Sequence, residues 1–367
     1  MAVRRIVFLL AVCGIAFFLL INWNNITIES TVDWFEEQFT QNSGDGYPVT
    51  VNSSKSARLE VMGGSVVLVN SVGINVYNKN GGLTLNEQHG FSFPAVSVSG
   101  DRSILYDAGG TSYKIQGKSK TYHTSQLTKK IITADMSGSG VYAIVTDSSD
   151  RLSEMTVYDE QNTQIFKCST EQNISAAAVN GKGNEAAVST VTTVDGEVKS
   201  TLVTYRFDRE EPVAKVELEK TLVLKVFYFE NGNIGVIGDN AFLTVSSGKI
   251  AERHDYPSKY IMSYGIDRKS GAALVLSGNE NKRDPVLSLF NDDGKKLSDT
   301  DLSDDFRSVF FTNEKACVMT SKELLIYNAK GERTNNTEIP ADGIDVTVIG
   351  NDAFVLGLNQ LRKIQLS

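Results

Sequence analysis

Three histidines, His89, His123 and His254, are the first groups to consider as metal ligands or general bases. None of them belongs to a His-x-x-His, Cys-x-x-Cys or His-Glu-x-x-His pattern, so the spacing predicts no zinc site. Each lies where one predicted strand returns to the next, beside aromatic residues such as Phe91 and Tyr256. We therefore interpret these five residues as turn or packing residues, and as the candidate binding residues of one loop face.

No other pattern in the chain indicates catalysis. It lacks a Gly-x-Ser-x-Gly elbow, a phosphate-binding glycine loop, a sialidase-type aspartate box and the Gly-His and Trp-Asp pairs of WD40 repeats. The acidic run at 299–305 lacks the central glycine and terminal glutamate of an EF-hand, which favours a solvated turn over a calcium site. We predict no catalytic residue, no bound cofactor and no metal.

The elements that would position these residues are short β-strands. From residue 47 onward, an aliphatic-aromatic strand repeatedly runs into a polar hairpin rich in Asn, Asp and Gly. Clear copies start near residues 75, 157, 205, 289 and 326, and weaker ones near 112 and 242. A spacing of about 40 residues is typical of the four-stranded blades of a β-propeller.

A second repeat, the apolar innermost strand of each blade, occurs eight times. These strands are expected at 59–61, 95–98, 131–134, 174–179, 222–229, 261–266, 309–312 and 344–349. The last unit has only three strands, and a spare strand at 47–51 precedes the first unit. The sequence therefore predicts an all-β, eight-bladed propeller whose last blade is closed by the N-terminal strand. Seven blades of about 46 residues are the alternative.

The N-terminus has the pattern of a membrane anchor. Arg4 and Arg5 precede an uncharged run at 6–21, and Trp23 suits the outer interface. This asymmetry predicts a single-pass helix with a cytoplasmic N-terminus and an extracytoplasmic propeller, for which membrane lipid is a partner. A cleaved signal peptide is the alternative, but no small-x-small cleavage site follows the run.

A short amphipathic helix is expected between anchor and propeller, because Val32, Phe35 and Phe39 recur at helical spacing. The predicted organisation is thus a cytoplasmic stub and anchor at 1–23, a helix and linker at 24–46, and a propeller at 47–367.

The net charge of the chain bears on the class of partner that it can bind. The formal net charge is −8 without a basic stripe, which argues against nucleic acid binding.

Cys13 lies in the anchor, whereas Cys168 and Cys317 fall in different predicted blades. We expect these last two to be buried, unpaired thiols.

Several segments together resemble a known family. Residues 22–25, 44–49, 88–94 and 105–113 resemble the domain-of-unknown-function 5711 family, an uncharacterised bacterial (Firmicutes-type) family of single-pass membrane proteins with a propeller-like ectodomain. The resemblance implies an anchored propeller and brings no activity, cofactor or site residue. The architecture is also similar, by analogy alone, to the eight-bladed quinoprotein-like scaffolds of envelope assembly.

Two functions follow as hypotheses. The first is a non-enzymatic scaffold that binds a protein or cell-envelope component on the loop face. The alternative is an extracellular enzyme that processes glycans or peptides with carboxylates converging at the central channel, because propeller sites draw single residues from distant blades.

Overall fold

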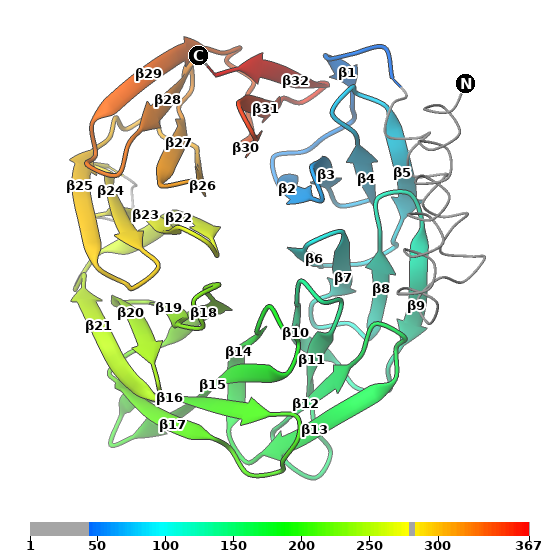
Figure 1. The fold of residues 1–367 in the computed structure, drawn as a ribbon, viewed down its shortest axis with the longest axis vertical. Coiled ribbons are helices and arrows are strands. Elements are labelled where there is room, and N and C mark those ends of the chain that lie inside the picture. The colour runs from blue at the N-terminus through cyan, green and yellow to red at the C-terminus, as the bar shows by residue number, and fades with distance from the viewer. Residues whose placement is uncertain (1–43, 279–282, 367) are drawn as a thin grey trace, which may run out of the picture.

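The computed structural model describes residues 44–278 and 283–366 of the chain. These residues form 32 β-strands, which Figure 1 shows as radial sheets around a central opening. The strands group into eight four-stranded antiparallel sheets. The predicted all-β propeller with eight blades is confirmed, and the seven-bladed alternative is wrong.

The first four blades follow the chain from its N-terminal side, each running from its innermost to its outermost strand. Blade 1 contains β2 (Arg58–Met62), β3 (Ser65–Val69), β4 (Gly73–Tyr77) and β5 (Leu83–Gln88). Blade 2 contains β6 (Pro94–Ser99), β7 (Arg102–Asp107), β8 (Ser112–Gln116) and β9 (Thr121–Gln126). Blade 3 contains β10 (Ile131–Met136), β11 (Tyr142–Asp147), β12 (Ser153–Tyr158) and β13 (Gln164–Thr170). Blade 4 contains β14 (Asn173–Val179), β15 (Glu185–Val194), β16 (Glu197–Arg206) and β17 (Ala214–Glu219).

The next three blades repeat this order, and the eighth combines both ends of the described chain. Blade 5 contains β18 (Val223–Tyr228), β19 (Ile234–Gly238), β20 (Ala241–Ser246) and β21 (Lys249–Asp255). Blade 6 contains β22 (Tyr260–Asp267), β23 (Gly271–Ser277), β24 (Val286–Asn291) and β25 (Lys296–Asp301). Blade 7 contains β26 (Ser308–Thr312), β27 (Lys315–Met319), β28 (Glu323–Tyr327) and β29 (Arg333–Glu338). Blade 8 contains β30 (Asp345–Ile349), β31 (Asp352–Leu356), β32 (Gln360–Gln365) and β1 (Val49–Thr50).

Ring closure occurs in blade 8, as the spare N-terminal strand predicted. β1 pairs antiparallel with β32, with Val49 opposite Leu361. Tyr47 extends the seam, because its hydroxyl donates to the main-chain oxygen of Asn78 at 2.8 Å and its ring meets Phe354 edge-on at 5.1 Å. The β1 strand thus ties blade 8 to blade 1.

The recurring hairpin signal has a local cause. At the turn after β4, the Asn78 side-chain oxygen accepts the main-chain N–H groups of Asn80 at 2.8 Å and Gly82 at 2.9 Å. Asn328 repeats this bond with the N–H of Glu332 at 3.0 Å. Gly81 takes a positive φ of 80°, which glycine adopts without steric cost. Local hydrogen bonds therefore explain why Asn and Gly recur there.

The apolar core lies between the blades. Eight buried clusters are present, one for each pair of neighbouring blades. In blade 3, for example, Val145 and Met155 pack against Ala186 and Val188 of blade 4. Successive side chains of a strand point to opposite faces of its sheet, and each face packs against one neighbouring blade. Both faces are therefore buried, which explains why many strands are almost entirely apolar.

The cysteines lie where the blade assignment placed them. Cys168 in β13 and Cys317 in β27 are both free, so the prediction of unpaired thiols is confirmed. The prediction that both are buried holds for Cys317 and is wrong for Cys168, which is only partly buried in the outermost strand of its blade. Burial raises the pKa of Cys168 to about 11 and that of Cys317 to about 12. Both thiols are therefore protonated at neutral pH, and each behaves as a packing residue.

Over the residues that the structure describes, no helix is long and apolar enough to cross a bilayer. The predicted anchor with Arg4, Arg5 and Trp23, and the predicted amphipathic helix, lie outside those residues.

Candidate functional site: the return face and the central channel

One face of the disc collects every loop at which an innermost strand begins, and we call it the return face. It comprises the returns from each outermost strand to the next innermost strand, and the loops that join second and third strands, since neighbouring strands are antiparallel. The returns are residues 51–57, 89–93, 127–130, 171–172, 220–222, 256–259, 302–307 and 339–344. The second-to-third loops are residues 70–72, 108–111, 148–152, 195–196, 239–240, 320–322 and 357–359, with residues 278 and 283–285 of the loop in blade 6.

The clearest apolar feature of this face is formed by two loops, residues 89–93 after β5 and residues 70–72 between β3 and β4. Phe93 is 70% exposed and Val72 is 60% exposed. The main-chain N–H of Phe93 donates to Asp107 Oδ1 at 2.8 Å, and the oxygen of Val72 accepts the N–H of His89 at 3.2 Å. The backbones of the two loops are thus held in place by hydrogen bonds, while the side chains of Phe93 and Val72 face solvent.

His89 and Phe91 form the support beneath these loops. His89 Nδ1 accepts the N–H of Phe91 at 2.9 Å, and its Nε2 lies 3.0 Å from the oxygen of Asn70. This pairing requires the neutral tautomer with the proton on Nε2. The two rings stack with centroids 5.0 Å apart, and His89 is 8% exposed. In this structure His89 acts as a turn residue.

The other two histidines do not join His89. His123 was predicted at a return, but it is the third residue of β9, where its ring lies 5.8 Å from that of Tyr113. His254 lies within β21, and its Nε2 contacts the oxygen of Gly294 at 2.8 Å. Tyr256 is at a return but buried, and its hydroxyl donates to the oxygen of Gly238 at 2.7 Å. The candidate residues therefore belong to separate local structures.

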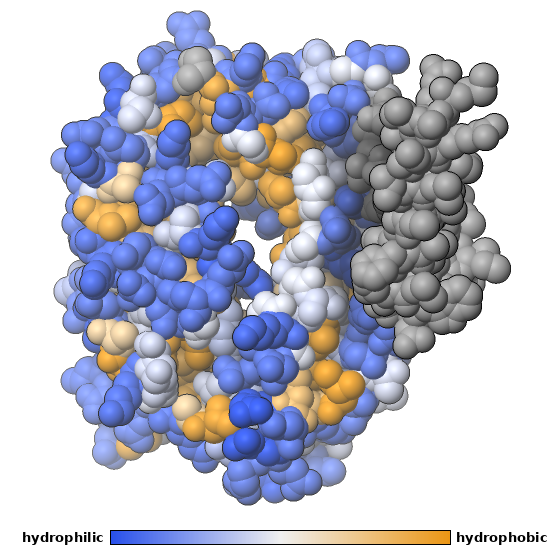
Figure 2. Space-filling view, viewed as in Figure 1, coloured by the Kyte–Doolittle hydropathy of each residue, from blue (hydrophilic) through white to orange (hydrophobic). Residues whose placement is uncertain are grey.

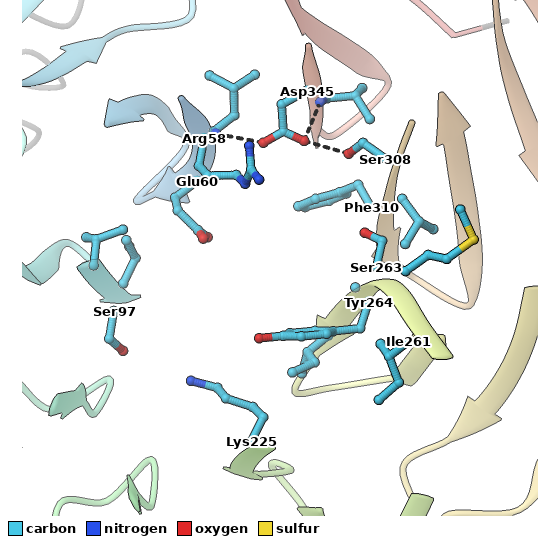
Figure 3. A pocket seen from close by; sticks show the side chains of 18 of the residues that line it. Arg58, Glu60, Ser97, Lys225, Ile261, Ser263, Tyr264, Ser308, Phe310 and Asp345 are labelled. Carbon is cyan, nitrogen blue, oxygen red and sulfur yellow. Dashed lines mark hydrogen bonds between the residues drawn. The ribbon is translucent and has the colours of Figure 1, made fainter. Parts of the chain in front are cut away.

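The second feature is a cavity of about 790 Å³ in the central channel. Figure 2 shows the opening at the middle of the ring, and Figure 3 shows the side chains that line it. Innermost strands of seven blades contribute to the lining, which includes five basic and three acidic residues. The charged members are Lys55, Arg58, Lys225, Arg268 and Arg307, with Glu60, Asp135 and Asp345.

Asp345 joins three blades at the ring-closing seam. Its Oδ2 accepts the N–H of Leu59 in β2 at 2.9 Å, and its Oδ1 accepts the hydroxyl of Ser308 in β26 at 2.5 Å and the N–H of Val346 at 3.0 Å. The residue is 9% exposed. Burial raises the pKa of Asp345, and these donors act in the opposite direction.

Asp135 makes the same kind of junction between blades 2, 3 and 4. Its Oδ1 accepts the hydroxyl of Ser97 in β6 at 2.7 Å, and its Oδ2 accepts the N–H of Val179 in β14 at 2.9 Å. Arg268, in the turn after β22, reaches Oδ1 at 3.6 Å from blade 6. This ion pair spans the channel near the face opposite the return face.

Glu60, Lys225 and Tyr264 point into the channel from β2, β18 and β22 (Figure 3). Burial is the main cause that raises the pKa of Glu60 to about 7, with repulsion from Asp345 adding to it and attraction to Lys225 opposing it. Glu60 is therefore close to half-protonated at neutral pH.

β-Bulges determine which side chains enter the channel. The innermost strands of blades 3 to 6 each carry a register shift near their second residue, for example between Val223 and Lys225. The extra residue in that strand, Leu224, is 50% exposed. A bulge re-aims the side chains that follow it, and this places Lys225 in the channel lining.

These channel residues could not be predicted from the sequence, because no local motif marks them. Glu60, Lys225 and Tyr264 come from three different blades, and only the closed ring brings them together. Within residues 44–278 and 283–366, no group of three or more His, Cys, Asp or Glu residues is placed to hold a metal ion.

Similar folds occur in solved structures. Sqt1 of Saccharomyces cerevisiae has a TM-score of 0.62 and 11% identity, covering 88% of this chain and 100% of its own. BamB of Moraxella catarrhalis has a TM-score of 0.55 and 10% identity, covering 87% of this chain and 98% of its own. AztD of Citrobacter koseri has a TM-score of 0.52 and 12% identity, covering 80% and 86%. At these identities the similarity establishes the fold alone.

No curated protein matches the chain in sequence. The model of a family of unknown function, DUF5711, matches residues 40–366, which span all eight blades and both strands of the closing seam. The chain therefore belongs to the DUF5711 family.

Proposed function

We propose that this propeller is a non-enzymatic scaffold that binds a protein partner through its return face. One observation carries the proposal. The five most exposed large apolar side chains of the described residues all lie on that face or at its strand ends: Phe93, Val72, Leu152, Val194 and Leu224, at 70%, 60%, 52%, 50% and 50%. They belong to consecutive blades, 1 to 5, and so follow one arc of the ring. The concentration of the most exposed large apolar side chains on one face of the disc is the support for an interaction surface there.

The proposed contact surface is built on a rigid support. The Phe93 loop is fixed by Asp107 and His89, and Val194 ends a ten-residue strand whose hairpin with β16 is paired to its tip. A preordered surface loses little conformational entropy on binding. BamB and Sqt1 share the architecture only, and no partner is transferred from them.

A double substitution tests the proposal. Phe93→Asp with Leu152→Asp places two charges on the return face, and we expect the affinity-purified full chain to lose its co-purifying partner. The matched control is Leu83→Asp with Val213→Asp, at residues 48% and 40% exposed on the opposite side of the blades. Equal partner recovery from both variants would contradict the proposal.

We further propose that residues 1–23 hold this scaffold at a membrane with the propeller on the extracytoplasmic side. The support is the charge asymmetry of Arg4 and Arg5 before an apolar run. Ser149 lies in an exposed return-face loop, so a Ser149→Cys variant should react with a membrane-impermeant maleimide in intact cells. Labelling only after lysis would contradict this orientation.

If the protein is instead an enzyme, Glu60 is the residue best suited to catalysis. A carboxylic acid with a pKa of about 7 inside a cavity has the property of a general acid. A hydrolytic pair would need a second carboxylate free to meet substrate, whereas both oxygens of Asp345 and of Asp135 already accept hydrogen bonds between blades. This arrangement favours binding over hydrolysis. A hydrolase activity on peptides or glycans that Glu60→Gln abolishes would reverse that preference.

A further inference from the structure

The central cavity carries an excess of positive charge inside an acidic protein. Its lining contains five lysines and arginines against three carboxylic acids, whereas the chain has a formal net charge of −8. Two of the acids, Asp135 and Asp345, are buried and hydrogen-bonded between blades. Asp135 faces Arg268 at 3.6 Å and Asp345 attracts Arg58, so basic groups remain in excess in the lining even when all three acids are ionised.

The cations are not equally available. Arg307 donates to the main-chain oxygen of Ala341 at 2.9 Å, Arg58 donates to that of Ala57 at 2.9 Å, and Arg268 faces Asp135 at 3.6 Å. Lys225 and Lys55 have no hydrogen bond or ion pair to their ammonium groups among the residues that the structure describes. Lys55 is exposed in the return before β2, whereas Lys225 lies within the cavity, where Glu60 attracts it without forming an ion pair. The Lys225 side chain is half-buried and points into the cavity (Figure 3). A partly desolvated cation of this kind is stabilised by an anion.

The cavity has two chemically different walls. Glu60, Ser97 and Lys225 extend from β2, β6 and β18, whereas Ile261, Tyr264 and Phe310 extend from β22 and β26 on the other side (Figure 3). Its volume of about 790 Å³ suits a small organic molecule. Such a molecule would have a charged end and an apolar or aromatic body.

We propose that the channel binds a small organic carboxylate, with Lys225 as its counter-ion and with Ile261, Tyr264 and Phe310 against its apolar body. A monoanion matches the one half-buried ammonium group of the lining that has no hydrogen bond or ion pair among the described residues. A phosphate would instead favour a paired arginine fork or a nest of main-chain N–H groups, and the channel arginines are already bound to oxygens.

Glu60 would make this binding depend on pH. Asp345 from β30 and Lys225 from β18 interact with it electrostatically. The other charged or titratable residues of the cavity lining are Lys55, Arg58, Asp135, Tyr264, Arg268 and Arg307. Protonated Glu60 can donate a hydrogen bond to a carboxylate, whereas ionised Glu60 repels it. With a pKa of about 7, the protonated fraction falls about tenfold between pH 6 and pH 8, so affinity should fall by up to that factor.

The test uses the full chain and three probes of one shape: 3-phenylpropionate, the neutral 3-phenylpropionamide and the cationic 3-phenylpropylamine. Saturation-transfer NMR and calorimetry should detect 3-phenylpropionate binding, with affinity higher at pH 6 than at pH 8. Lys225→Met retains the aliphatic stem and should abolish binding. Lys79→Met, at an exposed hairpin lysine, is the matched control and should bind like wild type. Glu60→Gln should bind at both pH values without the pH dependence.

Three results would overturn the proposal: no 3-phenylpropionate binding at millimolar concentration, binding of the amide or the amine as strong as that of the carboxylate, or undiminished binding in a Lys225→Met variant whose circular dichroism and Tm match wild type. If Lys225→Met loses binding and also has a lowered Tm, Lys225→Arg decides the outcome, because it keeps the positive charge and should restore binding. Failure of Lys225→Arg to restore binding in a folded protein would also count against the proposal. These outcomes are independent of partner binding on the return face.

Discussion

At the level of single residues, the buried acids Asp135 and Asp345 have a different role from Glu60. Asp135 and Asp345 each receive donors from the blade before and the blade after, so their charge links three blades. Glu60 receives no such donors and remains titratable near neutral pH. The first two therefore stabilise the ring, and the third responds to pH.

Asp135→Ala should lower the free energy of unfolding by about 3 kcal/mol, because it leaves the Val179 N–H, the Ser97 hydroxyl and Arg268 without their acceptor. Chemical denaturation measures the change. Asp150→Ala, at an exposed loop aspartate, is the control and should lie within about 0.5 kcal/mol of wild type. Equal stabilities of the two variants would show that the junction contributes nothing.

Glu60→Gln should stabilise the protein at alkaline pH. Folding raises the Glu60 pKa from 4.5 to about 7, so the folded state holds a proton that the unfolded state releases, and stability declines as pH rises through that window. Gln removes this decline and should raise the free energy of unfolding at pH 8 by about 1–2 kcal/mol, with little change at pH 4.5. Tm measured from pH 4.5 to pH 8 tests this, and a variant less stable than wild type at pH 8 would refute it.

Among the strands, the shortest one, β1, is expected to limit the stability of the closed ring. β1 has two residues, yet it completes blade 8 and brings Tyr47 against Phe354 and Asn78. Each other blade is closed within a continuous stretch of chain. The seam between β1 and β32 therefore depends on a few side chains.

Tyr47→Ala should lower the free energy of unfolding by about 2–3 kcal/mol, since it removes the ring contact and the hydrogen bond. Tyr47→Phe should cost about 1 kcal/mol, the contribution of the hydrogen bond alone. Phe93→Ala removes an aromatic ring that is 70% exposed and should be nearly neutral. If the Tyr47 and Phe93 alanine variants unfold at the same denaturant concentration, the seam does not limit stability.

Local signals explain which elements could be predicted. The Asn78 and Asn328 turns are closed by their own side chains, so the sequence around them predicts a hairpin wherever they occur. The predicted position of His123 was wrong because β9 is an outermost strand made mostly of polar residues, and such a composition resembles that of a loop. Glu60 and Lys225 could not be paired from the sequence, because their meeting depends on ring closure and on a bulge in β18.

At the scale of the whole molecule, the eight interfaces form a closed cycle in which every blade has two neighbours. Packing each blade between two neighbours covers both faces of every sheet, so the loops of the two faces, the outermost strands at the rim and the channel remain for recognition. The exposed apolar arc of blades 1 to 5 is the support for the proposed protein contact on the return face, and Lys225 is the support for the proposed small ligand in the channel.

Site-specific photo-crosslinking tests the central claim most directly. A benzoylphenylalanine residue is placed at Phe93 or Leu152 on the return face, or at Leu83 or Val213 on the opposite side of the blades, in the full chain produced in its own cells. We predict a defined partner adduct from Phe93 and Leu152, identical in mass for both, and none from Leu83 or Val213. The same adduct from the opposite side, or adducts from Leu83 and Val213 alone, would contradict a scaffold that binds through its return face.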